Sequence, residues 1–114
     1  MAYSELILET FSEDIARYPD LERHIERQKS LILEKPYFYS HGLGKGKGRD
    51  LRGLRSAHMR GGKYVFLIAI CEDCVRNGHM ERNQQYCGNN CLQELLTRVV
   101  FIAFGKHDDV YGIL

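Results

Sequence analysis

The residues that follow the last apolar run of the chain are the ones best suited to chemistry. Residues 99–104 read Val-Val-Phe-Ile-Ala-Phe and predict a buried strand, which stops at Gly-Lys-His-Asp-Asp-Val-Tyr, residues 105–111. A buried strand that ends in a His, a Tyr and several charged groups carries titratable side chains at its tip. Lys106, His107 and Tyr111 are therefore candidate functional residues.

A second group of candidates lies in a basic segment upstream. Residues 45–63 contain seven bases and a single acid, whereas residues 1–35 contain eight acids and five bases. Segregated charge gives one surface a positive potential even though the net charge is only +1 at pH 7. A solvated loop would explain the same bases, but the glycines and the short strand among them favour binding of RNA or DNA. The seven bases are Lys45, Lys47, Arg49, Arg52, Arg55, Arg60 and Lys63.

The two groups would form one site if the last strand pairs beside the strand at residues 64–70, because its end would then bring Lys106, His107 and Tyr111 toward His58. His58 and Arg60 alternate along one predicted strand and therefore share a face. Cleavage of RNA without a metal needs a base for the 2′-OH proton, cations for the charged phosphate, and an acid for the leaving 5′-oxygen. His, Arg or Lys, and Tyr can do this work, and Tyr can also stack on a base. Each residue alone is more often a surface or core residue, so the prediction depends on their convergence.

Four cysteines form a separate candidate site for a metal ion. Cys71 and Cys74 are separated by two residues, and Cys87 and Cys91 by three. Two such pairs of thiolates can surround one zinc ion, and four protein ligands would make that zinc structural. Two disulfides, or reduced thiols in a redox-sensitive loop, are alternatives. His79 could also replace one cysteine as a ligand.

Two helices are predicted in the first third of the chain. Residues 3–11 fit either an edge strand or the start of a helix, and Ser12 is a plausible N-cap for a first helix. A second helix is predicted from residue 20, because apolar residues recur there at three- and four-residue intervals. Pro36 would end this second helix, whose polar face is typical of a helix that lies on a sheet.

The strands follow the helices. Residues 54–60 alternate between two faces, Gly61 and Gly62 signal a hairpin turn, and residues 64–70 are apolar throughout, as in a central strand covered on both faces. The last strand is predicted to begin at Val99. This order predicts an α+β fold with two N-terminal helices packed on a small, mostly antiparallel sheet.

The length and the composition predict how the chain is organised. It is expected to be a single domain over residues 1–114, in which a glycine-rich loop spans residues 37–53 and a Cys-rich insert at residues 71–91 lies between the last two strands. The longest apolar run is too short to span a membrane, and the N-terminus does not read as a secretion signal. A cytoplasmic location is therefore expected, with no membrane partner.

Several segments also match a known pattern. Residues 11–19 are similar to a first helix with a proline turn, and residues 25–36 are similar to a second helix with a terminal proline. Residues 51–55, leading into residues 62–65, match a strand pair, and residues 104–111 match a closing motif that is commonly Gly-His-Arg-Lys-Asp-Val-Tyr. With these segments the chain resembles the RelE/ParE superfamily of toxins from type II toxin–antitoxin systems, and the closing motif is the most specific of them.

The resemblance implies a RelE-like fold and a small toxin that a cognate antitoxin wraps and holds inactive. RelE- and HigB-like members cut mRNA in the ribosomal A site, which implies a ribosome-dependent mRNA endonuclease with mRNA and the ribosome as partners. ParE-like members instead poison DNA gyrase, so a gyrase inhibitor is the alternative. A non-toxic, zinc-stabilised binding module with the same fold is a third possibility.

The resemblance also assigns roles to individual residues. Arg55, His58 and Arg60 match the basic strand positions of the family, and Val65 stands where the family often has an Arg. The residues with implied catalytic roles are His58, His107, Tyr111 and Arg60. The residues expected to bind RNA are Lys45, Lys47, Arg49, Arg52, Arg55, Lys63 and Lys106.

Overall fold

The computed structural model describes residues 2–46, 49–87 and 96–112. Its helices are α1 (Glu9–Ile15), the 3-10 helix η1 (Pro19–Leu21), α2 (Glu22–Glu34), α3 (Cys71–Arg76), α4 (Met80–Cys87) and α5 (His107–Gly112). Its strands are β1 (Ser4–Ile7), β2 (His41–Gly42), β3 (Lys45–Gly46), β4 (Arg49–Asp50), β5 (Arg55–Met59), β6 (Tyr64–Ile70) and β7 (Arg98–Lys106). No helix in these described ranges is both long enough and apolar enough to cross a membrane.

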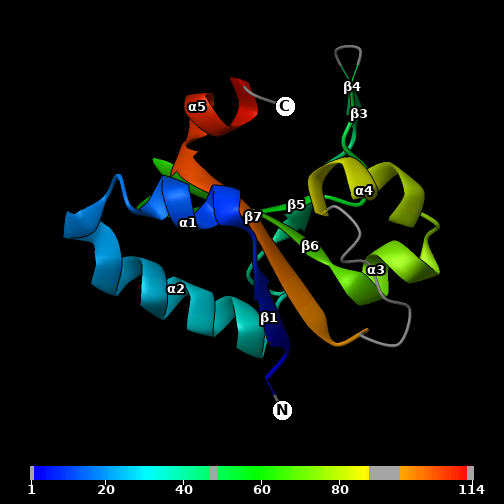
Figure 1. The fold of residues 1–114 in the computed structure, drawn as a ribbon, viewed down its shortest axis with the longest axis horizontal. Coiled ribbons are helices and arrows are strands. Elements are labelled where there is room, and N and C mark those ends of the chain that lie inside the picture. The colour runs from blue at the N-terminus through cyan, green and yellow to red at the C-terminus, as the bar shows by residue number, and fades with distance from the viewer. Residues whose placement is uncertain (1, 47–48, 88–95, 113–114) are drawn as a thin grey trace.

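Five strands form one sheet in the order β1-β7-β6-β5-β2, and β3 and β4 form a separate hairpin (Figure 1). β1 runs parallel to β7, with Ser4 opposite Arg98, and the other neighbouring strands of the sheet are antiparallel. The predicted α+β class with a mostly antiparallel sheet is therefore confirmed. The sheet is mixed because the first strand of the chain pairs with the last strand.

One face of the sheet packs against α1 and α2, which lie to the left of β7 in Figure 1. Phe11 on α1 is fully buried, and its ring centre lies 5.3 Å from that of Phe101 and 6.0 Å from that of Phe66. Ile25 and Ile32 contribute the apolar face of α2, whose spacing predicted that helix. Apolar burial on this face supplies much of the driving force for folding.

The opposite face packs against α3, α4 and α5. The buried side chains of this second cluster alternate along the strands with those of the first, so β6 is covered on both sides, as its apolar run predicts. The buried residues of this cluster are Leu54, Val65, Leu67, Ala69, Cys71, Cys74, Cys87, Val100, Ile102, Ala103 and Val110.

Side chains of helix α1 also form hydrogen bonds with the backbone of β7. The register between β6 and β7 shifts at one point, and Ile102 is bulged out of the ladder there. The hydroxyl of Thr10 donates a hydrogen bond to the Ile102 carbonyl at 2.6 Å, and the carboxylate of Asp14 accepts one from the Phe104 N–H at 3.0 Å. Two polar groups near the bulge therefore find partners on the helix that covers it.

The structure corrects three expectations about the helices. α1 begins at Glu9, after Leu8 as N-cap residue, so Ser12 lies inside the helix and does not cap it. α2 begins at Glu22, because η1 forms the turn after the proline. The insert at residues 71–91 is not simply a polar interruption, since its described part folds as α3 and α4 with their cysteines facing the core.

Three details of the strands also differ from the prediction. β5 ends at Met59, and Arg60 lies in the turn with φ of 57°, a left-handed conformation that is uncommon outside glycine. β7 begins at Arg98, one residue before the predicted start. The segment predicted as a glycine-rich loop contains the short strands β2, β3 and β4, and β2 completes the edge of the main sheet.

Candidate active site

The sheet brings His58 and His107 together from distant parts of the sequence. His58 on β5 lies opposite Val65 on β6, and Val65 lies opposite Gly105 on β7. Two residues after Gly105 the strand gives way to α5, which begins with His107. The two imidazole rings are stacked, with 6.1 Å between their centres and 20° between their planes.

A third histidine, His41, extends this stack on the other side. Its ring centre lies 5.0 Å from that of His58, and the two planes differ by 12°. The Nε2 atom of His41 is 2.9 Å from the hydroxyl oxygen of Ser56, which is fully buried on β5. This contact fixes the orientation of the His41 ring. We refer to His41, His58 and His107 as the imidazole row.

Sequence reasoning missed His41. It lies in the segment predicted as a loop, where no hydrophobic pattern marks a strand. Its position depends on β2, a strand of two residues in which His41 pairs with Ser56. The signal that could have located it is that Ser56 and His58, two residues apart on β5, share one polar face. A strand that pairs with β5 would place its own side chains beside them on that face.

Tyr111 lies at the α5 end of the imidazole row. It follows His107 by four residues, so the two side chains share one side of the helix. Their ring centres are 4.5 Å apart, with 55° between the planes. The structure therefore groups three of the four predicted catalytic side chains, His58, His107 and Tyr111, along one surface.

Two backbone features hold α5 against the end of the sheet. The N–H of His107 donates a hydrogen bond to the carbonyl of Lys63 in the turn between β5 and β6, at 3.3 Å. Gly105 allows a close approach of the helix, because a Cβ atom there would lie only 3.3 Å from Cγ2 of the buried Val110. These contacts position His107 relative to the strand that carries His58.

The pKa of His58 reflects its place in the middle of the row. Partial burial lowers its pKa from the ordinary value of 6.5, and the neighbouring His41 and His107 lower it further, because protonating one imidazole disfavours protonating the next. The lowered pKa favours the neutral form of His58, which can accept a proton. His107 has a carboxylate beside it, since its Nδ1 lies 3.4 Å from an oxygen of Asp108.

Two exposed lysines lie at the same end of the sheet as the row. Lys106 ends β7 directly before His107, and as the partner of Tyr64 across the ladder it lies on the face of the sheet opposite to His58. Lys63 lies in the adjoining turn, with its ammonium 5.7 Å from the centre of the Tyr64 ring. Both side chains are exposed and so can meet a phosphate. Arg60 is exposed in the same turn, and not on the strand face that the sequence predicted for it.

Arg55 lies on the other face of the sheet from His58. It shares that face with Ala57 and Met59, according to the alternation of β5. Its Nε donates to the Ser40 hydroxyl at 2.8 Å, and its guanidinium carbon lies 5.2 Å from the centre of the Tyr37 ring. These contacts give Arg55 a structural task in fixing the chain between α2 and β2.

Arg52 is paired with a carboxylate. Its Nε and Nη2 donate to the two oxygens of Asp50 at 2.9 and 2.7 Å, and Arg82 of α4 lies 3.5 Å from the same carboxylate. The hydrogen bonds from Arg52 hold the pKa of Asp50 well below its usual range, and Asp50 in turn raises the pKa of Arg52. Arg52 is thus less available to a nucleic acid than an unpaired arginine.

Of the remaining predicted RNA-binding residues, two lie in the β3–β4 hairpin, which projects from the sheet in Figure 1. Lys45 and Arg49 lie in its two strands, where Lys45 pairs with Asp50 and Arg49 with Gly46. Lys47 lies outside the described residues.

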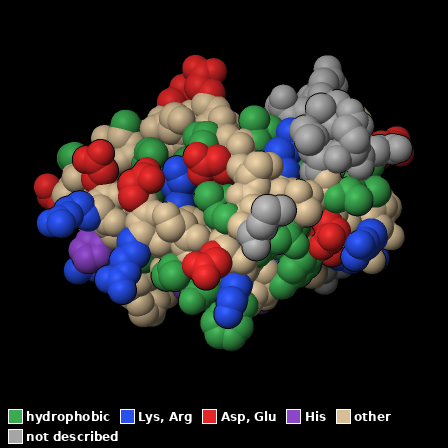
Figure 2. Space-filling view, turned by 90° about the horizontal axis from the view of Figure 1, so that it is seen from below, with side chains coloured by type: hydrophobic (Ala, Val, Ile, Leu, Met, Phe, Trp, Pro, Cys, Tyr) green, Lys and Arg blue, Asp and Glu red, His purple; other side chains and the backbone are tan. Residues whose placement is uncertain are grey.

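On the face of the molecule that Figure 2 shows, acidic and basic side chains are interspersed, so neither sign dominates that face.

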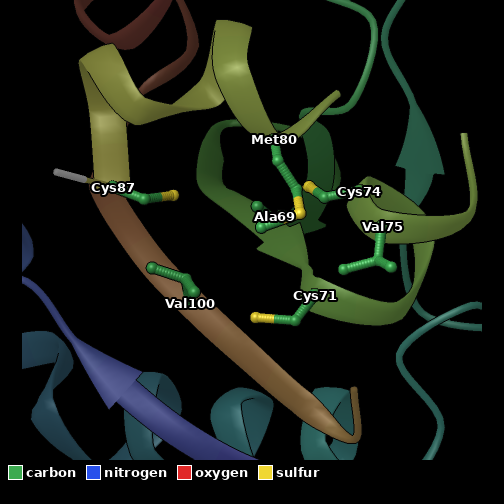
Figure 3. Close-up of a pocket in the computed structure, with 7 residues that line it drawn as sticks. All are labelled: Ala69, Cys71, Cys74, Val75, Met80, Cys87 and Val100. Carbon is green, nitrogen blue, oxygen red and sulfur yellow. The ribbon is translucent and has the colours of Figure 1, made fainter. Parts of the chain in front are cut away.

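Three of the four predicted zinc ligands, Cys71, Cys74 and Cys87, are buried on the second face of the sheet, and Cys91 lies outside the described residues. They line one small cavity between α3, α4 and β7 (Figure 3). His79 is not among the lining residues, and its Nδ1 lies 3.1 Å from Nη1 of Arg82. No three His, Cys, Asp or Glu side chains within the described ranges already surround a common metal position.

No protein-family model matches the sequence, and a search of curated proteins found no match. Among solved structures, a chain of the toxin–antitoxin complex RelBE2 from Mycobacterium tuberculosis is similar, with a TM-score of 0.58 and 17% sequence identity. The similarity covers 94% of this chain and 100% of that chain. A likeness at this level of identity shows the fold. The chain therefore has the RelE-like fold that its sequence resemblance implies.

Proposed function

We propose that this chain is the toxin of a toxin–antitoxin pair and cleaves mRNA on the ribosome, with the imidazole row and Tyr111 as its active site. The observation that carries the proposal is the stacking of His58 on His107 beside Tyr111 at the end of a RelE-like sheet, where two exposed lysines also lie. Groups that can exchange protons are thereby collected on one surface.

The proposed reaction needs only protein side chains. Neutral His58 accepts the proton of the 2′-OH as that oxygen forms a bond to phosphorus, and the bond from phosphorus to the 5′-oxygen breaks. The departing 5′-oxygen takes a proton from His107 or Tyr111, which leaves a cyclic 2′,3′-phosphate and a free 5′-OH. A ring-centre separation of 6.1 Å is roughly twice a hydrogen-bond length, so one phosphate over the row can contact both imidazoles.

The other side chains act on charge and on position. The ammonium groups of Lys63 and Lys106 stabilise the additional negative charge on the phosphate in the transition state. His41, held by Ser56, keeps the His58 ring in place and favours its neutral form. Tyr111 can also stack on a base, as aromatic side chains do in sites for single-stranded RNA.

The direct test is cleavage of mRNA in a purified translation system. We expect the wild-type chain to cut the message on the ribosome, and the variants His58→Ala and His107→Ala to cut it roughly 10²–10⁴-fold more slowly. His24→Ala is the matched control, because His24 is an exposed histidine on α2, away from the row. Equal activity in all four proteins would exclude the imidazoles from the chemistry.

An antitoxin is the proposed protein partner. The similar fold belongs to a chain solved in a toxin–antitoxin complex, which supports a bound partner for this chain also. The most informative genomic observation is a short neighbouring open reading frame that encodes a DNA-binding protein. Co-expression of that protein should abolish mRNA cleavage, whereas expression of an unrelated antitoxin should leave it unchanged.

A specific observation favours inhibition of DNA gyrase as a second candidate. Val65 is fully buried in the strand position between His58 and Gly105, so the floor beneath the row is apolar where the RelE/ParE superfamily often has an arginine. A supercoiling assay separates the two functions. Loss of gyrase activity with intact RNA would replace the nuclease proposal by this one.

A further inference from the structure

The cavity between α3, α4 and β7 is lined by an unusual number of sulfur atoms. Cys71 and Cys74 come from consecutive turns of α3, Cys87 from the end of α4, and Met80 from its beginning. Figure 3 shows that the sulfur atoms of all four side chains point into the space enclosed by these elements. The other lining residues, Ala69, Val75 and Val100, are apolar, so sulfur is the one kind of metal donor among the cavity's side chains.

Two of the sulfur atoms accept hydrogen bonds from polar side chains, which packing of an apolar cavity alone would not require. Nε of Arg98 donates a hydrogen bond to Sγ of Cys71 at 3.3 Å, and Nδ2 of Asn83 donates one to Sγ of Cys74 at 3.1 Å. Arg98 is only 8% exposed, and Asn83 is fully buried. Burying the amide of Asn83 against a neutral thiol is costly, because a thiol sulfur is a weak acceptor.

The cost falls if the sulfurs carry negative charge. Hydrogen bonds from N–H groups to an ionised acceptor are roughly twice as strong as those to a neutral one. Three thiolates around one Zn²⁺ leave a single net negative charge, which the guanidinium of Arg98 beside Cys71 would offset. Arg98 and Asn83 would then orient the ligands from behind, as the outer partners of metal ligands commonly do.

The size of the cavity also limits what it can hold. Its free volume is about 10 Å³, close to the least that holds one water molecule, so it admits a single ion and no organic ligand. The sulfurs do not yet surround one point, because no three potential ligands of the described residues share a metal position. Binding must therefore draw the three cysteine side chains inward by rotation about their Cα–Cβ bonds.

We propose that Cys71, Cys74 and Cys87 form a thiolate site for one soft metal ion, for which zinc is the test ion, with the thioether of Met80 as a neighbouring soft donor. Thiolate and thioether sulfurs select soft and borderline ions over magnesium and calcium. The proposal uses the three described cysteines and does not depend on Cys91. It concerns the packing of α3 and α4 and is independent of RNA cleavage.

The test measures metal on the reduced full-length chain. We expect about one zinc per chain after zinc loading and removal of excess, measured by plasma mass spectrometry. Cobalt in place of zinc should give the near-ultraviolet charge-transfer band of thiolate-bound cobalt, and zinc should raise the melting temperature of the protein. These readouts use the wild-type chain and need no variant to fold.

Variants then assign the ligands. Cys71→Ser, Cys74→Ser and Cys87→Ser should each lower the zinc content and weaken the cobalt band, while Val75→Ala, in the same cavity but without a sulfur, should keep both. Reduced, folded wild-type protein that takes up neither metal would overturn the proposal. Full metal content in the triple serine variant, or a protein whose cysteines are disulfide-linked as purified and metal-free, would overturn it equally.

Discussion

The rings of His58 and His107 stack at the end of the sheet although one residue belongs to β5 and the other begins α5. The path between them through the ladder runs from His58 to Val65 and on to Gly105. The separation of the two rings is therefore set by the register of two strand pairs. A slip of one residue in either pair would turn one side chain to the opposite face.

The first prediction concerns the pH dependence of cleavage. If His58 is the base, the rate falls as the pH drops through its pKa, which lies below 6.5. His41→Ala removes a neighbouring imidazole that lowers the pKa of His58 and exposes the His58 ring, so that pKa should rise. The acidic limb of the profile of kcat/KM should then move to higher pH. An unmoved limb in this variant would show that another group accepts the proton.

The second prediction concerns stability. Because the folded-state pKa of His58 is lowered from 6.5, the unfolded chain binds this proton more readily, and stability falls as the pH drops below that value. Urea unfolding of the wild-type chain and of His58→Gln, each measured at several pH values, isolates the effect. The variant should lose less stability than the wild type between neutral and mildly acidic pH, and parallel curves would contradict the shift.

A third prediction tests how α4 packs against the loop before β5. A Cβ at Gly53 would lie 2.7 Å from Cβ of His79 and 2.8 Å from Nδ2 of Asn83, and φ there is +96°. Gly53→Ala should therefore cost more than the roughly 1–3 kcal/mol of a strained backbone alone. Gly61→Ala is the control, since φ is +68° there but the space is open. Equal losses of unfolding free energy in both variants would argue against the contact.

A fourth prediction concerns the bulge in β7. Asp14→Ala leaves the N–H of Phe104 without its acceptor and should destabilise the fold by about 1–3 kcal/mol. Asp14→Asn keeps an amide oxygen at the same place and should cost less than about 1 kcal/mol, because the exposed ion pair with Arg17 contributes little. Chemical denaturation measures both. A larger loss in the asparagine variant would show that charge matters more than the hydrogen bond.

The strands of the core and α2 could be predicted from the sequence because their signals are local. The apolar run of β6 gave its bounds without error, and the helical spacing of Ile25 and Ile32 located α2. The start of α1 was missed because Leu8 at its N-cap makes no side-chain cap hydrogen bond. α3 was missed because Cys71 and Cys74 were assigned to a metal and not counted among its buried apolar positions.

The site could be predicted in part for the same kind of reason. The pairing of the last strand with residues 64–70 predicts that His58, His107 and Tyr111 lie together, and the ladder and the ring distances agree. Arg55 lies on the face of the sheet opposite to His58. Only the alternation of side chains along the strand distinguishes the two positions, and residue type does not. His41 could not be found, because a strand of two residues is decided by pairing and not by its own composition.

The parallel pairing of β1 with β7 has a consequence for the order of folding. β1 leaves the translating ribosome early, but its partner strand begins at Arg98, so it has nothing to pair with until nearly all of the described chain has been made. The contact is among the most non-local in the molecule, and such contacts form late. His107 begins α5, which directly follows β7. A nascent chain in which β7 has not yet paired therefore lacks a complete imidazole row. A newly made molecule would therefore complete the proposed site only after β7 and α5 have left the ribosome.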